Sequence, residues 1–114
     1  MKRGDVVLVD VPFTDYTGSK VRPALVVSSS GVNRAGDCIL VPISSNVSNP
    51  SPWDVLAYPT DAEFKATGLH RSSAFKCGKL VTLSANLIKR RLGAAGSGYL
   101  AQVAGRIKDA LDIR

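Results

Sequence analysis

The sequence predicts a small, curled β-barrel with helical cover from the C-terminal part of the chain. Two observations support this fold class. Between residues 5 and 83, six short apolar runs follow one another, separated by stretches rich in glycine, proline, serine and asparagine. The last segment then has the spacing of an amphipathic helix, with apolar residues at Leu100, Val103, Ala104, Ile107 and Leu111. Many short strands followed by helices are typical of such a barrel.

The first three predicted strands cover residues 5–11, 24–29 and 38–43. The run from Val6 to Val9 is unbroken rather than alternating, which indicates burial on both faces or a sheet that curls on itself. Pro23 suits the beginning of the second strand because proline has no backbone donor, and Pro42 predicts an edge or a bulge in the third. A hairpin loop with two glycines, residues 30–37, joins the second strand to the third.

The later elements are three more strands and two helices. The strands are expected at residues 54–58, 73–77 and 79–83, with one helical turn near residues 62–66. Ser84 can cap a short helix that carries Leu87, Ile88 and Leu92 and stops at Gly93. The amphipathic helix is expected at about 98–112. With 114 residues, the chain can bury one modest core, so we expect a single domain over residues 1–114.

The charge balance points to a polyanionic partner. The chain has 15 Lys and Arg against 9 Asp and Glu, a net charge of +6. Such a surface favours a nucleic acid, an acidic protein tail or, less directly, a membrane surface, although many small proteins are basic without such a partner. Cys38 and Cys77 lie among apolar residues and form neither a disulfide framework nor a metal site. With no signal peptide and no membrane span in the sequence, we expect a cytoplasmic protein.

Arg22 and Ser44 are the strongest candidates for chemistry. A guanidinium is always charged, binds two phosphate oxygens at once and can stabilise a pentacovalent phosphorane. The alternative is a surface arginine at a strand end. Ser44 and Ser45 directly follow the third strand, where hydroxyls often only satisfy loop backbone. Three hairpin-connected strands would bring the arginine and the serines to one concave face.

Other basic and aromatic residues occur near loops or strand ends and could surround the same groove. Trp53 and Tyr16 could stack on unpaired bases, although core burial is an equal alternative for Trp53. His70 is the only histidine, which excludes a two-histidine ribonuclease mechanism, and its loop composition predicts a surface residue. Residues 89–91 could contact RNA or stabilise a helix end. The basic residues of the predicted groove are Lys20, Arg22, Arg34, Arg71, Lys76 and Lys79.

The order and spacing of several short motifs resemble the MazF/PemK family of toxin endoribonucleases over nearly the whole chain. The resemblance implies an SH3-like barrel, a homodimer and an acidic antitoxin whose disordered C-terminal segment folds onto the toxin. The matching pieces are Gly4–Val6, Arg22–Val27, Val41–Ser44, Gly68–Leu69, Cys77, Leu80–Leu83 and Leu92–Gly93.

The same resemblance implies metal-independent, cofactor-free cleavage of single-stranded RNA. Arg22 is then the catalytic arginine, Ser44 binds the scissile phosphate, and the RNA 2′-hydroxyl attacks to give a 2′,3′-cyclic phosphate and a 5′-hydroxyl. Gly78 stands where some members carry an acid, so no general base is assigned. The alternative is a non-catalytic binding protein, as the related CcdB toxins act on DNA gyrase. From their positions near loops and strand ends, the predicted RNA-binding residues are Lys20, Ser45, Trp53, Arg71, Lys76 and Lys79.

Overall fold

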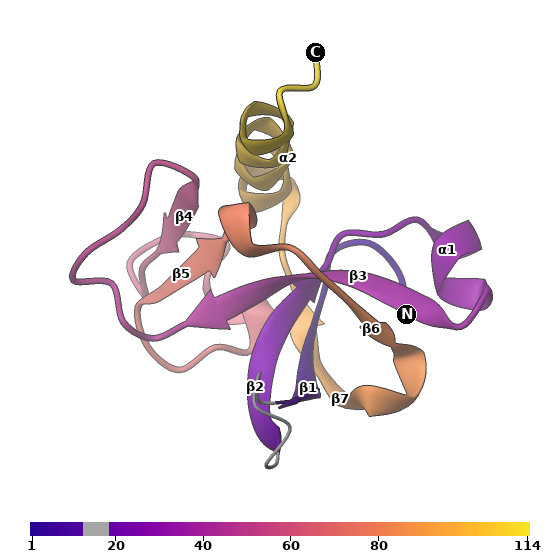
Figure 1. The fold of residues 1–114 in the computed structure, drawn as a ribbon. Helices are drawn as coiled ribbons and strands as arrows, with labels where there is room; N and C mark the ends of the chain where they lie inside the picture. The colour runs from indigo at the N-terminus through magenta and orange to yellow at the C-terminus, as the bar shows by residue number, and fades with distance from the viewer. Residues whose placement is uncertain (13–18) are drawn as a thin grey trace.

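The structure of the protein, a computed structural model, describes residues 1–12 and 19–114. Within these ranges, seven strands and a long C-terminal helix account for most of the chain (Figure 1). The strands are β1 (Asp5–Pro12), β2 (Ser19–Val26), β3 (Asp37–Ser44), β4 (Asp54–Ala57), β5 (Ser73–Lys76), β6 (Val81–Ser84) and β7 (Ile88–Ala94). The helices are α1 (Ser30–Arg34) and α2 (Ser97–Leu111), with single 3-10 turns η1 (Lys65–Thr67), η2 (Cys77–Lys79) and η3 (Ala85–Leu87).

All strands pair antiparallel, in the order β4-β5-β3-β2-β1-β7, and β6 joins the same sheet through β3. β3 is therefore the central element, since it pairs with β2 on one edge and with both β6 and β5 on the other. The mainly β architecture with a C-terminal helix confirms the predicted fold class. No helix in the described part of the chain is long and apolar enough to cross a membrane.

The central strands bury both of their faces, as the unbroken run in β1 predicts. Val7 and Val9 belong to a cluster inside the curl of the sheet, together with Ala24, Val26, Cys38 and Leu40. Val6 points the other way, into a second cluster with Leu25, Val41 and Phe75 that α2 covers through Tyr99 and Val103. Successive strand residues alternate between these two faces, which we call the inner and outer faces.

Pro23 of β2 and Pro42 of β3 lie where the pairing between these two strands stops. The backbone N–H of Val27 donates to Ile39, so by alternation the nitrogen of Pro23 points toward β3, just beyond the last β2–β3 pair at Ala24 and Pro42. The nitrogen of Pro42 points to the opposite edge, where β3 changes partners from β6 to β5. Neither proline therefore removes a ladder hydrogen bond. Because Pro23 does not interrupt the pairing with β1, β2 begins at Ser19 rather than at residue 24.

The predicted helix after Ser84 is wrong. Ser84 does accept a hydrogen bond from the backbone of Asn86, but it caps only the single turn η3. Residues 88–94 then form β7, an edge strand on β1. Leu, Lys and Arg are good helix formers, but pairing with the buried strand β1 outweighs this local propensity. The predicted hairpin loop at residues 30–37 contains the short helix α1, and the helical turn expected near residues 62–66 lies at η1.

Two glycines allow η1 to lie directly against β7. A Cβ atom on Gly93 would come within 2.3 Å of the backbone oxygen of Ala66, and one on Gly68 within 2.3 Å of the oxygen of Leu92. Gly68 also has a φ of 75°, which favours glycine. The segment after η1 is thereby fixed beside β7.

Candidate functional site

Arg22 and Ser44 belong to neighbouring strands and to one face of the sheet. The β2–β3 register ends with Ala24 opposite Pro42, and Arg22 and Ser44 each lie two residues beyond this last pair, at the same end of the two strands. Both residues therefore follow the inner-face series, at the end of the sheet where β3 leaves β2. Arg22 is exposed and Ser44 half-buried. The Oγ atom of Ser44 accepts a hydrogen bond from the backbone of Asn46 at 3.1 Å.

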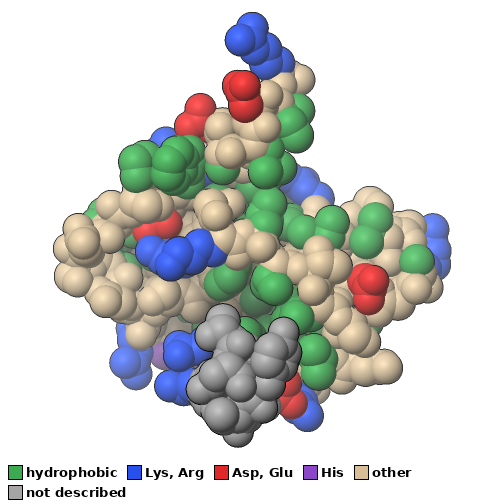
Figure 2. All heavy atoms as spheres, viewed as in Figure 1, with side chains coloured by type: hydrophobic (Ala, Val, Ile, Leu, Met, Phe, Trp, Pro, Cys, Tyr) green, Lys and Arg blue, Asp and Glu red, His purple; other side chains and the backbone are tan. Residues whose placement is uncertain are grey.

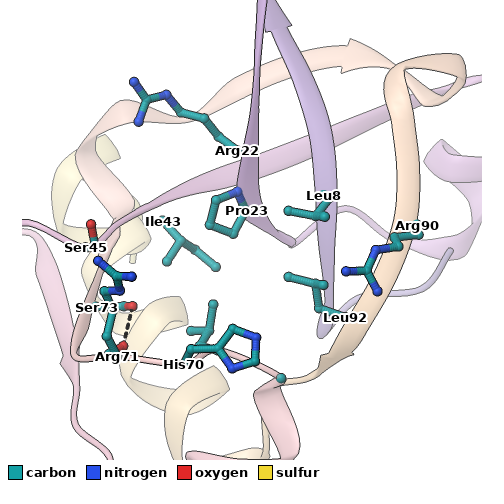
Figure 3. A pocket seen from close by; sticks show the side chains of 12 residues that line it. Leu8, Arg22, Pro23, Ile43, Ser45, His70, Arg71, Ser73, Arg90 and Leu92 are labelled. Carbon is teal, nitrogen blue, oxygen red and sulfur yellow. Dashed lines mark hydrogen bonds between the residues drawn. The ribbon is translucent and has the colours of Figure 1, made fainter.

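The residues that follow these two line a hollow of about 300 Å³ on the outer face, which we call the outer hollow. Figure 3 shows Pro23, Ile43, Leu8 and Leu92 at its centre, while the Arg22 guanidinium is directed away from it. Polar groups stand around this apolar floor. The lining residues are Leu8, Arg22, Pro23, Ile43, Ser45, Gly68, Leu69, His70, Arg71, Ser73, Arg90 and Leu92.

The outer hollow is positively charged. Arg71 and Arg90 line it, Arg22 lines it with the guanidinium directed away, and among the described residues no carboxylate does. The ion pairs in the described part of the chain involve other basic side chains. Lys76 pairs with Asp54, Lys89 with Asp10 and Arg91 with Asp5. On the face in Figure 2, basic side chains gather around the single histidine at the lower left. Such a site favours an anionic ligand with an apolar part.

The described residues of the predicted RNA-binding set divide between two places. Ser45 and Arg71 line the outer hollow, and Lys20 lies on β2 two residues before Arg22, on the same face. Lys76 is in a 2.7 Å ion pair with buried Asp54. Although burial alone raises the pKa of this carboxyl, hydrogen bonds from Lys76 and Ser51 hold the pKa below its usual value.

Lys79 and Trp53 lie near Lys76 and do not line the outer hollow. The Trp53 indole donates to Asp109 of α2 at 3.1 Å and packs on Gly78, where a Cβ atom added to the glycine would lie 3.5 Å from the nearest Trp53 atom. Trp53 is 38% exposed, so it is not a core residue, and its contacts with Asp109 and Gly78 mean that it does not project freely into solvent. These contacts hold the loop before β4 against α2. Tyr16, the other stacking candidate, lies outside the described residues, and Arg34 lies on α1.

The sequence analysis does not name His70 or Ser73 as lining residues of the hollow, and it leaves Arg90 between RNA contact and a helix end. Arg90 was expected at a helix end, but β7 pairs it with Leu8, so both side chains reach the outer hollow. His70 is exposed, as predicted, yet it lines the hollow. Ser73 is buried and donates to the carbonyl of Arg71 at 2.8 Å, which fixes this part of the wall. A strand interpretation of residues 88–92 would have identified Arg90.

The two cysteines are not suited to nucleophilic chemistry. Both are buried and free. Burial raises the pKa of the Cys38 thiol, and it raises the pKa of the Cys77 thiol to about 11, so both are protonated near neutral pH. In the described part of the chain, no three His, Cys, Asp or Glu side chains come together as metal ligands.

Known proteins share both the fold and the sequence pattern. Residues 2–111 match the family model described as PemK-like, MazF-like toxin of type II toxin-antitoxin system. No curated protein matches the chain in sequence. Solved structures match over nearly the whole chain. The Deinococcus radiodurans MazE-MazF complex matches with a TM-score of 0.78 and 23% identity, covering 100% of this chain and 98% of that one.

Two mycobacterial structures are similar. A mycobacterial endoribonuclease in complex with its cognate antitoxin has a TM-score of 0.77 and 20% identity, and covers 100% of this chain and 97% of that one. The Mycobacterium tuberculosis toxin MazF-mt6 has a TM-score of 0.72 and 18% identity, with 95% and 98% covered. At these identities the solved structures establish the fold alone. The family model, in contrast, matches the sequence over residues 2–111 and establishes the family. The chain therefore belongs to the family of PemK-like, MazF-like toxins of type II toxin–antitoxin systems.

Proposed function

We propose that this chain is a metal-independent endoribonuclease that cleaves single-stranded RNA in the cytoplasm as the toxin of a toxin–antitoxin pair. The observation that carries the proposal is that Arg22 and Ser44 each lie two residues beyond the last β2–β3 pair, at the end of the inner face and next to a basic hollow. Family membership and the solved mycobacterial endoribonuclease support it. We also propose that residues 1–114 of each chain form a single domain.

Arg22 and Ser44 divide the proposed work on the scissile phosphate. The guanidinium binds the non-bridging oxygens and stabilises the extra negative charge of the pentacovalent transition state. The Ser44 hydroxyl donates a hydrogen bond to a phosphate oxygen, which leaves its Oγ free to keep accepting from Asn46. Lys20, Ser45 and Arg71 hold the flanking backbone. The nucleophile is the RNA 2′-hydroxyl, so the serine forms no covalent intermediate.

Replacing the 2′-hydroxyl at the scissile position tests this mechanism. We expect an oligonucleotide with one 2′-deoxy residue at the cut site to resist cleavage, because the attacking oxygen is missing. The all-RNA oligonucleotide of the same sequence should be cut in excess EDTA. Gel analysis of both end-labelled substrates checks the expectation, and cutting of the 2′-deoxy substrate at an unchanged rate would reject 2′-hydroxyl attack.

We propose an acidic antitoxin as the partner. The chain has a net charge of +6, and the Arg22 side chain is exposed, so an acidic segment that covers it would compete with RNA. Solved structures of this fold include a MazE-MazF complex and a mycobacterial endoribonuclease in complex with its cognate antitoxin. Opposite charges would speed the association, and salt would slow it by screening.

We also propose a homodimer, formed partly by strand and helix edges. An apolar groove of about 330 Å³ runs along α2, and Leu111 at its end is 53% exposed. Hydrophobic side chains form a strip down the middle of the face in Figure 2, below α2. Apolar surface of this kind is typical of a protein interface. The groove is lined by Arg3, Val27, Ile39, Leu80, Ala104, Ile107, Lys108 and Leu111.

Light scattering tests the dimer at micromolar concentration. We expect twice the chain mass of 12.0 kDa for the unmodified protein. Leu111→Asp should shift the mass toward the monomer, since a buried unpaired carboxylate opposes association. Gln102→Asp, an exposed position on the same helix outside the groove, is the control and should leave the mass unchanged. A monomer mass for the unmodified protein would refute the dimer.

A further inference from the structure

We propose that the outer hollow holds one unstacked nucleotide next to the scissile bond, and that Arg90 is the residue that binds and selects it. The inference rests on the proposed ribonuclease function for the identity of the polymer. The binding chemistry itself depends only on the hollow, so it can be tested with single nucleotides.

Two pairs of adjacent residues connect the hollow to the proposed catalytic groups. Consecutive strand residues point to opposite faces, so Arg22 faces the inner side while Pro23 forms the floor of the hollow. Ile43 and Ser45 line the hollow, while Ser44 between them follows the opposite series. Consecutive Cα atoms are about 3.8 Å apart. A strand of RNA that crosses this end of the sheet can therefore place a phosphate at Arg22 and Ser44 and its neighbouring base in the hollow.

The lining matches the two parts of a nucleotide. The apolar floor of Leu8, Pro23 and Leu92 offers a dry surface to a planar base (Figure 3). Arg71 and Arg90 stand on opposite sides of that floor and offer forked donors to phosphate or to a base edge. Unpaired RNA bases are recognised by stacking on aromatic rings or arginine planes and by hydrogen bonds to their edges, and His70, Arg71 and Arg90 supply such groups around the hollow. At about 300 Å³ the hollow lies at the small end of ligand sites and excludes a duplex.

The hollow is formed before any ligand binds. Gly68 and Gly93 let η1 and β7 touch through backbone atoms, which fixes the wall that carries Leu69 and His70. Thr67 is fully buried, donates to the carbonyl of Phe64 and accepts from the backbone of Leu69. A preformed site loses less entropy on binding than one that must close.

Arg90 is set apart from its two basic neighbours. Lys89 lies 2.9 Å from Asp10, and Arg91 lies 3.0 Å from Asp5, so both charges are compensated within the fold. Arg90 has no carboxylate partner among the described residues and directs its guanidinium toward the hollow (Figure 3). This contrast supports a ligand for Arg90.

The first test is titration calorimetry with the four ribonucleoside monophosphates. We expect at least one to bind the unmodified protein, and Arg90→Ala to weaken that binding by about tenfold or more, as for a lost charge-assisted hydrogen bond. Lys89→Ala removes the same charge one residue away and should change affinity by less than about threefold. Equal losses in both variants, or no binding of any nucleotide by the unmodified protein, would overturn the subsite.

The second test maps RNA 5′ ends after cleavage by the same variants. We expect Arg90→Ala to relax the base preference at one position beside the cut, while Lys89→Ala keeps the original pattern. An unchanged pattern in Arg90→Ala would overturn the selecting role and leave the ribonuclease intact. Arg90-dependent nucleotide binding by a protein that cuts no RNA would keep the nucleotide site and reject the ribonuclease.

Discussion

Arg22→Ala should reduce RNA cleavage by about 100-fold or more while the protein remains folded. The expected loss is that of a preorganised group that stabilises transition-state charge. The fold should survive because the Arg22 side chain is exposed, and among the described residues it has no ion pair. Antitoxin binding should weaken only partly, since apolar contacts would remain. A cleavage assay and a thermal melting curve on the same preparation measure both effects.

Arg34→Ala is the matched control for Arg22→Ala. Arg34 is an exposed arginine on α1, outside the outer hollow and outside the β2–β3 pair. Arg34→Ala removes the same charge as Arg22→Ala, but outside the proposed site. It should therefore leave the cleavage rate within about threefold of that of the unmodified protein. An unfolded Arg22→Ala protein would make this arginine structural, and a folded, fully active one would remove it from the site.

Phe75→Ala should lower the free energy of unfolding by about 3–5 kcal/mol, the usual range for an aromatic residue lost from a core. Phe75 is fully buried on β5 and meets the Tyr99 ring of α2 edge-on, with ring centroids 5.6 Å apart. It also pairs with Ile43, next to the pair formed by Ser44 and Ala74. The substitution therefore loosens both the helix and the end of β3 that carries the candidate serine.

Urea unfolding of Phe75→Ala and Phe75→Leu measures this contribution. Phe75→Leu keeps most of the apolar volume and should cost clearly less, because the remaining cavity is smaller. RNA cleavage by Phe75→Ala should fall below that of Phe75→Leu at temperatures where both are folded. Equal unfolding free energies for the two variants would show that the cavity is not the cause.

The core strands could be predicted from the sequence because an unbroken run of apolar residues indicates burial on both faces. Val6 to Val9 are apolar at every position, and the structure uses both faces, with Val6 in one cluster and Val7 and Val9 in the other. The C-terminal helix was likewise visible from its spacing, and it begins and ends within one residue of the expected range. Elements whose pattern is local and strong need no tertiary information.

Residues 88–94 could not be assigned from the sequence for the opposite reason. Their composition suits a helix, and only the free edge of β1 makes them a strand. Because of this error Arg90 was expected at a helix end, whereas in the structure it lies in the wall of the outer hollow. Likewise, nothing local indicates that Asp54 binds Lys76, 22 positions later, or that Trp53 reaches Asp109 of α2. With these long-range partners, Lys76 and Trp53 do not line the outer hollow, and their contact with RNA stays a prediction.

The chemistry of the RNA ends produced by the purified protein tests the central claim most directly. Long single-stranded RNA would be incubated with the protein in excess EDTA, and the product ends analysed by kinase labelling and mass spectrometry. Cleavage through the 2′-hydroxyl, assisted by Arg22 and Ser44, predicts discrete products with 5′-hydroxyl and 2′,3′-cyclic phosphate ends. Products with 5′-phosphates, or intact RNA together with inhibition of DNA gyrase, would contradict it.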